Sequence, residues 1–90
     1  MIGNCAVCGK ENIEVFVVSS ACGAMSFAYC KDCLRAGAEP YSQLVLYVAC
    51  SSARCDEEVS EWFKPVIDWT LNHLDISREQ FWEDVGKVEF

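Results

Sequence analysis

Two Cys-x-x-Cys pairs constrain this chain more than any other feature of its sequence. The first pair is Cys5 and Cys8, the second is Cys30 and Cys33, and 21 residues separate them. Two residues between cysteines let a tight turn aim both sulfur atoms at one point, and Gly9 can supply the left-handed backbone position that such a turn needs. Two pairs at this separation predict a four-cysteine metal site, and zinc is the ion that such sites usually hold.

The spacing also indicates what kind of zinc site this is. Four thiolates fill a tetrahedral site, whereas a catalytic zinc usually keeps one position open for water or substrate. We therefore expect one structural Zn²⁺ and no catalytic or cofactor-binding residue. His73 is not expected to be a ligand, because four cysteines complete the site, and as a general base it has no nucleophile to pair with. The chain is accordingly expected not to be an enzyme.

The segment between the cysteine pairs predicts a β-hairpin. Residues 13–20 and 25–29 are β-branched and aromatic runs, and residues 19–24 between them are typical of a turn. After Cys33, residues 34–36 favour a helix that Gly37 ends. A cysteine knuckle, a hairpin and a second cysteine pair at the start of a helix follow the order of a treble clef.

Residues 3–37 therefore resemble treble-clef zinc fingers, which include nucleic-acid binders and protein-interaction modules. The resemblance implies metal binding without choosing among those functions. The whole chain is also similar to small phage-encoded zinc-finger proteins with a knuckle near Met1.

Three cysteines lie outside the two pairs: Cys22, Cys50 and Cys55. An odd total of seven cysteines, without a recognisable export signal, argues against a disulfide framework. We interpret Cys50 as a small buried side chain at the end of an apolar helix, and Cys22 and Cys55 as ordinary loop thiols. A second metal site or a redox pair of Cys50 and Cys55 is the alternative, although it lacks a fourth ligand.

The remainder of the chain predicts three helices packed on the zinc-binding part, in one α+β domain of residues 1–90. The first runs from Pro40 to about Cys50, with a strand as the alternative. The second covers residues 56–74, where Pro65 should kink it or split it after Phe63. The third starts at Ser77, which has capping-box spacing to Gln80.

Residues 56–74 have one apolar face and one acidic face. The predicted apolar face consists of Val59, Trp62, Phe63, Val66, Thr70 and Leu74. Trp69 and His73 fall at its edge, beside Trp62. They can be the half-buried rim of the core, or Trp69 can be part of an aromatic anchor for a partner, since Trp is enriched at interface hot spots.

The net charge of −7 is carried entirely by residues 56–90, which contain ten acidic residues and three basic ones. No basic stripe of the kind that nucleic-acid binding requires is apparent. We therefore expect a protein partner, bound through Glu57, Glu61, Trp62 and Trp69, and leave the oligomeric state open. One alternative is a nucleic-acid-binding zinc finger whose basic face combines Lys10, Lys31, Arg35 and Arg54. The other is an acidic decoy or inhibitor of a nucleic-acid-binding protein, such as a host-defence protein.

The longest apolar run, residues 44–50, has seven residues, far fewer than the roughly 20 that a membrane-spanning helix needs. The N-terminus lacks the basic and apolar regions of a signal peptide. We therefore expect a cytoplasmic protein without a membrane partner.

Overall fold

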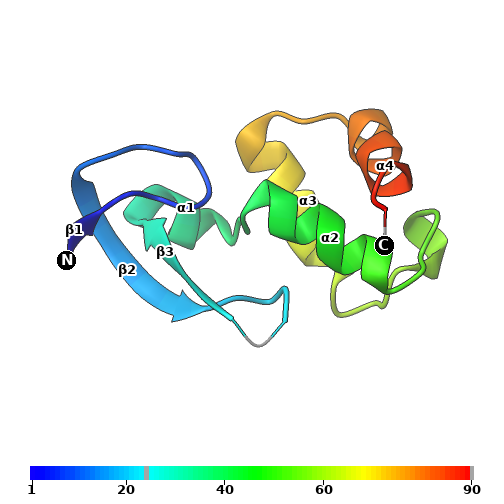
Figure 1. Ribbon diagram of the computed structural model, residues 1–90, viewed down its shortest axis with the longest axis horizontal. Helices are drawn as coiled ribbons and strands as arrows, with labels where there is room; N and C mark the ends of the chain where they lie inside the picture. The colour runs from blue at the N-terminus through cyan, green and yellow to red at the C-terminus, as the bar shows by residue number, and fades with distance from the viewer. Residues whose placement is uncertain (24, 90) are drawn as a thin grey trace.

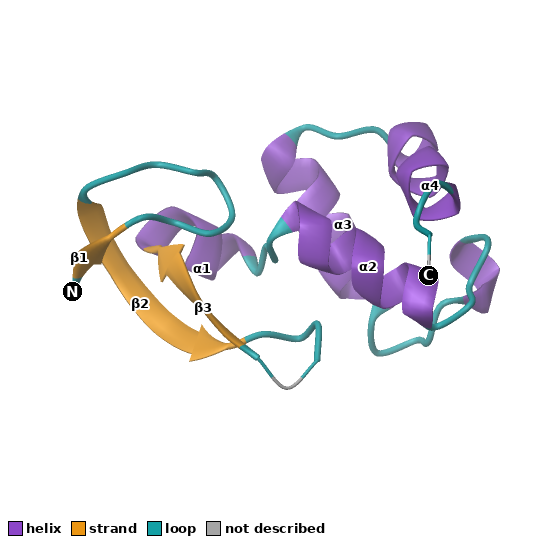
Figure 2. Ribbon diagram, viewed as in Figure 1, coloured by secondary structure: helices purple, strands orange, loops and turns teal. Residues whose placement is uncertain are grey.

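A three-stranded antiparallel sheet precedes the helices, so the predicted α+β class is confirmed (Figures 1 and 2). The computed structural model describes residues 1–23 and 25–89, which leaves Ala24, in the turn predicted for residues 19–24, outside the described residues. The strands are β1 (Ile2–Gly3), β2 (Ile13–Ser19) and β3 (Ser26–Cys30), in the order β1-β2-β3. Strands β2 and β3 form the predicted hairpin, in a register that places Val15 opposite Cys30.

The helices are α1 (Lys31–Ala36), α2 (Tyr41–Cys50), the short 3₁₀ helix η1 (Asp56–Glu58), α3 (Lys64–Leu74) and α4 (Arg78–Gly86). Helix α1 ends at Gly37, whose φ of 71° is the left-handed conformation expected there. Pro40 lies just before α2, and the strand alternative for this segment is wrong. The Ser77 hydroxyl accepts a hydrogen bond from the Gln80 amide and caps α4 as predicted.

The split after Phe63 that Pro65 was expected to allow is present, but the residues before it do not form the helix predicted for the start of residues 56–74. Residues 56–58 form η1, and α3 begins only at Lys64, with Pro65 in its first turn. A proline there loses no hydrogen bond, but its ring would clash with a helical turn on its N-terminal side. Val59 and Phe63 are nevertheless buried, as the apolar pattern required.

We call residues 1–37 the cysteine half and residues 38–89 the helical half; they lie side by side along the longest axis of the molecule (Figure 1). In the helical half, α2 packs against α4. The buried side chains there form one core, which includes Leu44, Val48, Phe63, Ile67, Leu71, Phe81 and Val85. In the cysteine half, a much smaller cluster contains Cys5, Val15, Cys30 and Cys33.

The tip of the hairpin crosses from one half to the other. Cys22 is 6% exposed and belongs to the core of the helical half, with Ala21 packed beside it. The prediction of a loop thiol at Cys22 is therefore wrong, and so is the prediction that Cys50 is buried, because Cys50 is exposed at the end of α2. Cys55 is exposed as predicted. Within the described part of the chain, no helix has the length and apolar character to cross a membrane.

Candidate metal centre

The four predicted ligands meet at one point. The sulfur atoms of Cys5, Cys8, Cys30 and Cys33 all lie within 4.8 Å of one another. The Sγ atoms of Cys8 and Cys30 are 3.8 Å apart. Zinc–sulfur bonds of about 2.3 Å in a tetrahedron separate neighbouring sulfur atoms by roughly 3.8 Å. The cluster therefore has the donor atoms and the size that one tetrahedral metal ion requires.

The first cysteine pair is held by backbone hydrogen bonds. The Cys5 amide donates to the Lys10 carbonyl at 2.9 Å, and the Gly9 amide donates to the Cys5 carbonyl at 3.1 Å. Gly9 has a φ of 78°, the left-handed conformation predicted for this turn. The Ala6 amide donates to the Ala28 carbonyl at 2.8 Å and fixes the knuckle against β3. The turn is therefore formed by the backbone, and the sheet determines where its sulfur atoms point.

The second pair bridges the sheet and the first helix. Cys30 is both the last residue of β3 and the N-cap of α1, and Cys33 is buried one turn into that helix. The Cys30 amide donates to the Cys5 sulfur at 3.3 Å. An amide–sulfur hydrogen bond offsets part of the negative charge that a metal-bound thiolate carries. The two pairs are thus joined directly by the peptide backbone.

The electrostatics differ from one sulfur atom to the next. Burial raises the pKa of the Cys5 thiol, but hydrogen bonds from the backbone of Cys8, Cys30 and Val7 outweigh it and lower that pKa to about 6. At Cys33, burial raises the pKa, and hydrogen bonds with the neighbouring thiols raise it further. Crowded thiols resist losing all their protons together, and a divalent cation removes that resistance because it binds the thiolate form.

One contact to this centre comes from a residue far along the chain. The Nε2 atom of His73, on α3, lies 3.2 Å from the Sγ atom of Cys33. The imidazole is not one of the four groups whose ligand atoms are mutually within 4.8 Å. One turn earlier on α3, Trp69 lies against Gly37, where a Cβ atom would come within 2.8 Å of the indole ring. Sequence reasoning placed both residues at an edge of the helix but missed what that edge faces.

A buried carboxylate, which no sequence pattern predicted, also joins the two halves. Glu39 accepts hydrogen bonds from the hydroxyls of Ser20 at 2.7 Å and Tyr29 at 2.6 Å. Its amide donates to the Thr70 hydroxyl at 3.0 Å. Burial and the hydrogen bond to Glu39 raise the pKa of Tyr29, which therefore stays protonated as a donor. Burial, followed by the charge of Glu39, raises the pKa of Cys22 to about 11.

The four residues predicted to bind a partner are all exposed, but they do not share one helix. Trp62 is 59% exposed and precedes α3, whereas Trp69 is 50% exposed and lies within it. Trp62 packs edge-on against Tyr47 and Phe63, which fixes its ring at the surface. Glu57 belongs to η1, and Glu61 pairs with Lys64 at 2.9 Å. The single acidic helix face of the sequence interpretation is therefore replaced by separate exposed groups.

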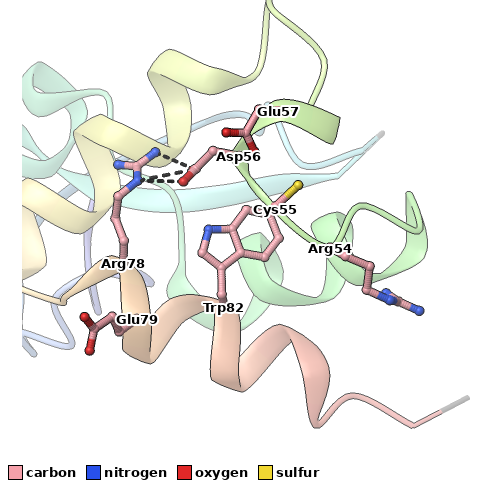
Figure 3. Close-up of a pocket in the computed structure, with 7 residues that line it drawn as sticks. All are labelled: Arg54, Cys55, Asp56, Glu57, Arg78, Glu79 and Trp82. Carbon is pink, nitrogen blue, oxygen red and sulfur yellow. Dashed lines mark hydrogen bonds and ion pairs between the residues drawn. The ribbon is translucent and has the colours of Figure 1, made fainter.

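Part of the acidic charge of the helical half has a cationic partner. Arg78 binds Asp56 at 2.8 Å and Asp68 at 2.5 Å, and its hydrogen bond to Asp56 lowers the pKa of that carboxyl. The same arginine borders an open hollow of about 420 Å³ in which Trp82 stands (Figure 3). Glu57 and Arg54 also line this hollow. The indole N–H of Trp82 is buried, and the described residues offer it no hydrogen-bond partner.

The basic residues considered for a nucleic-acid-binding face come from separate parts of the chain. Lys31 and Arg35 are one turn apart on α1, in the cysteine half. Arg54 lies in the loop that follows α2. Lys31 and Arg35 therefore belong to a different element, in a different half of the molecule, from Arg54.

Comparison of the chain with protein-family models, with curated proteins and with solved structures finds no match.

Proposed function

We propose that this chain is a binding module of the treble-clef type, stabilised by one structural zinc ion, which recognises a partner protein through its helical half. The observation that carries the zinc assignment is the cluster of four sulfur atoms within 4.8 Å of one another. Four thiolates favour zinc over magnesium or calcium, which prefer oxygen ligands. Cys5, Cys8, Cys30 and Cys33 would hold the ion, and its role would be to stabilise the fold.

The partner surface is proposed from the exposure of the tryptophans. Trp62 keeps more than half of its surface in solvent although Tyr47 and Phe63 hold its ring in place. A large aromatic side chain that is both exposed and already ordered loses little conformational entropy on binding, which suits it to be an anchor. Trp69 is the second candidate anchor, while Glu57 and Glu61 would favour a partner with a basic surface and speed its association.

Metal analysis tests the zinc assignment. We expect one zinc per chain, retained in Cys50→Ser and Cys55→Ser and lost in Cys5→Ser, Cys8→Ser, Cys30→Ser or Cys33→Ser. Two zinc ions per chain, or zinc lost when Cys50 or Cys55 is replaced, would contradict this ligand set.

Affinity capture from the native host, followed by binding measurements on the protein recovered, tests the partner surface. Trp62→Ala should weaken binding about 100-fold, in the range of an interface hot spot, while circular dichroism and zinc content stay unchanged. The matched control is Val17→Ala, which removes a similarly exposed apolar side chain, 56% exposed, from the cysteine half. Equal affinities for the two variants would place the surface elsewhere.

A further inference from the structure

We propose that His73 donates a hydrogen bond from Nε2 to the thiolate of Cys33 and thereby fastens helix α3 to the zinc centre. The inference rests on the proposed zinc site and adds to it a positioning residue from the helical half. Forty residues separate His73 from Cys33 along the chain, yet their atoms are 3.2 Å apart. That distance lies within the range of a hydrogen bond to sulfur, which is a larger acceptor than oxygen.

The chemistry of the acceptor determines the direction of the bond. A zinc-bound thiolate has no proton to donate, so the imidazole must carry its proton on Nε2. His73 is a partner of the ligand rather than a ligand itself, because four thiolates already complete the tetrahedron and the imidazole lies outside their cluster. An N–H donor at this position offsets thiolate charge, as the backbone amide of Cys30 does at Cys5.

The surroundings show that α3 is held in position for this contact. Trp69 lies against Gly37, the residue that ends the zinc-binding helix α1, so a larger residue at Gly37 would displace the indole ring. The hydroxyl of Thr70 accepts a hydrogen bond at 3.0 Å from the amide of Glu39, which lies in the segment between α1 and α2. Trp69 and His73 therefore present one side of α3 to the cysteine half, and Thr70 holds the same helix to the segment between α1 and α2. Loss of the metal should loosen this side of α3, and with it the exposed ring of Trp69.

A spectroscopic test is possible because His73 is the only histidine in the sequence. The chain is loaded with ¹¹³Cd²⁺ in place of zinc, and the imidazole nitrogens are observed by ¹H–¹⁵N correlation NMR. We expect the proton on Nε2, with a small scalar coupling to cadmium through the hydrogen bond. A proton on Nδ1, absence of any coupling, or the large coupling of a nitrogen bound directly to the metal would each overturn the proposal.

Zinc release to a chelator tests the energetic consequence. His73→Phe keeps a ring but removes the donor, and should release zinc about tenfold faster, since loss of a partner to a metal ligand typically weakens binding 10- to 100-fold. His73→Gln keeps an N–H donor and should restore most of the slow release. Asn72→Ala, at an exposed neighbouring position, is the control and should behave like the unmodified chain.

The outcomes separate this inference from the proposed function. If His73→Phe releases zinc as slowly as the unmodified chain, or if His73→Gln is as fast as His73→Phe, the hydrogen bond is not what holds α3 to the centre. If the unmodified chain binds one zinc but shows no coupling, this inference alone fails. If it binds no zinc at all, the proposed function fails and this inference fails with it.

Discussion

In the cysteine half, the buried side chains gather around four sulfur atoms, whereas in the helical half they fill a continuous core between α2, α3 and α4. The difference extends to the surface. Strand β2 leaves Phe16, Val17 and Val18 exposed, while the helices turn most of their aliphatic side chains inward. The cysteine half therefore buries too little apolar surface to be stable by packing alone, and metal coordination can supply what packing does not. Small folds can thus combine two sources of stability in one chain.

The largest effect should come from removing a metal ligand, which breaks the cysteine half selectively. Cys8→Ser should unfold residues 3–37, because the binding free energy of structural zinc, of order 10 kcal/mol, is also folding free energy. In amide NMR spectra, signals of residues 3–37 should lose dispersion while helical circular dichroism persists. Cys50→Ser, at an exposed thiol, is the matched control and should change neither. A zinc-free Cys8→Ser chain with a dispersed spectrum would falsify the structural role.

A core substitution should break the other half and leave the metal in place. Ile67 is completely buried, and Ile67→Ala should lower the free energy of unfolding by about 3 kcal/mol through lost burial and the cavity left behind. Urea denaturation followed by circular dichroism measures this loss, and metal analysis should still find one zinc. Leu46→Ala, at an exposed position on α2, should cost less than about 0.5 kcal/mol. Loss of zinc in Ile67→Ala would mean that the two halves unfold as one unit.

The smallest of the three effects lies where the halves meet. Glu39→Leu should destabilise the chain by about 2 kcal/mol, because it leaves the buried hydroxyls of Tyr29 and Ser20 without their acceptor. In a Tyr29→Phe background the same substitution should cost less, since one of the two donors is already gone. A double-mutant cycle of urea denaturation curves measures the difference. Equal costs in both backgrounds would show that this hydrogen bond does not couple the halves.

Local patterns were enough to predict much of the fold. The spacing of the cysteines predicted the cluster, Gly9 and Gly37 marked left-handed turns, and Ser77 marked the start of α4. The apolar residues at three- and four-residue steps in residues 56–74 predicted that Val59 and Phe63 are buried, and they also predicted a helix that contains both. Turns can bring residues three or four apart to the same core, so the period predicted burial correctly and helix wrongly. Pro65 was the local signal for the split.

The features that the sequence did not predict depend on contacts between distant segments. Cys22 is buried because the hairpin tip reaches the helical core, and Cys50 is exposed because the last turn of α2 points it away from that core. Glu39 looked like any other surface acid until Ser20, Tyr29 and Thr70 surrounded it. Likewise, nothing near His73 in the chain indicates that it faces Cys33. Such pairings arise from packing between distant segments, and the spacing of apolar residues within one segment carries no information about that packing.

Because Cys22 is buried where the two halves meet, the rate of its reaction with a thiol reagent depends on how often the halves separate. Cys50 and Cys55 are exposed and open to an alkylating reagent at all times, whereas Cys22 is covered and its raised pKa keeps it protonated. Only when the hairpin tip leaves the helical core can the reagent reach it. The rate at which Cys22 is alkylated would thus report how often the hairpin tip separates from the helical core, and no cysteine has to be introduced for the measurement.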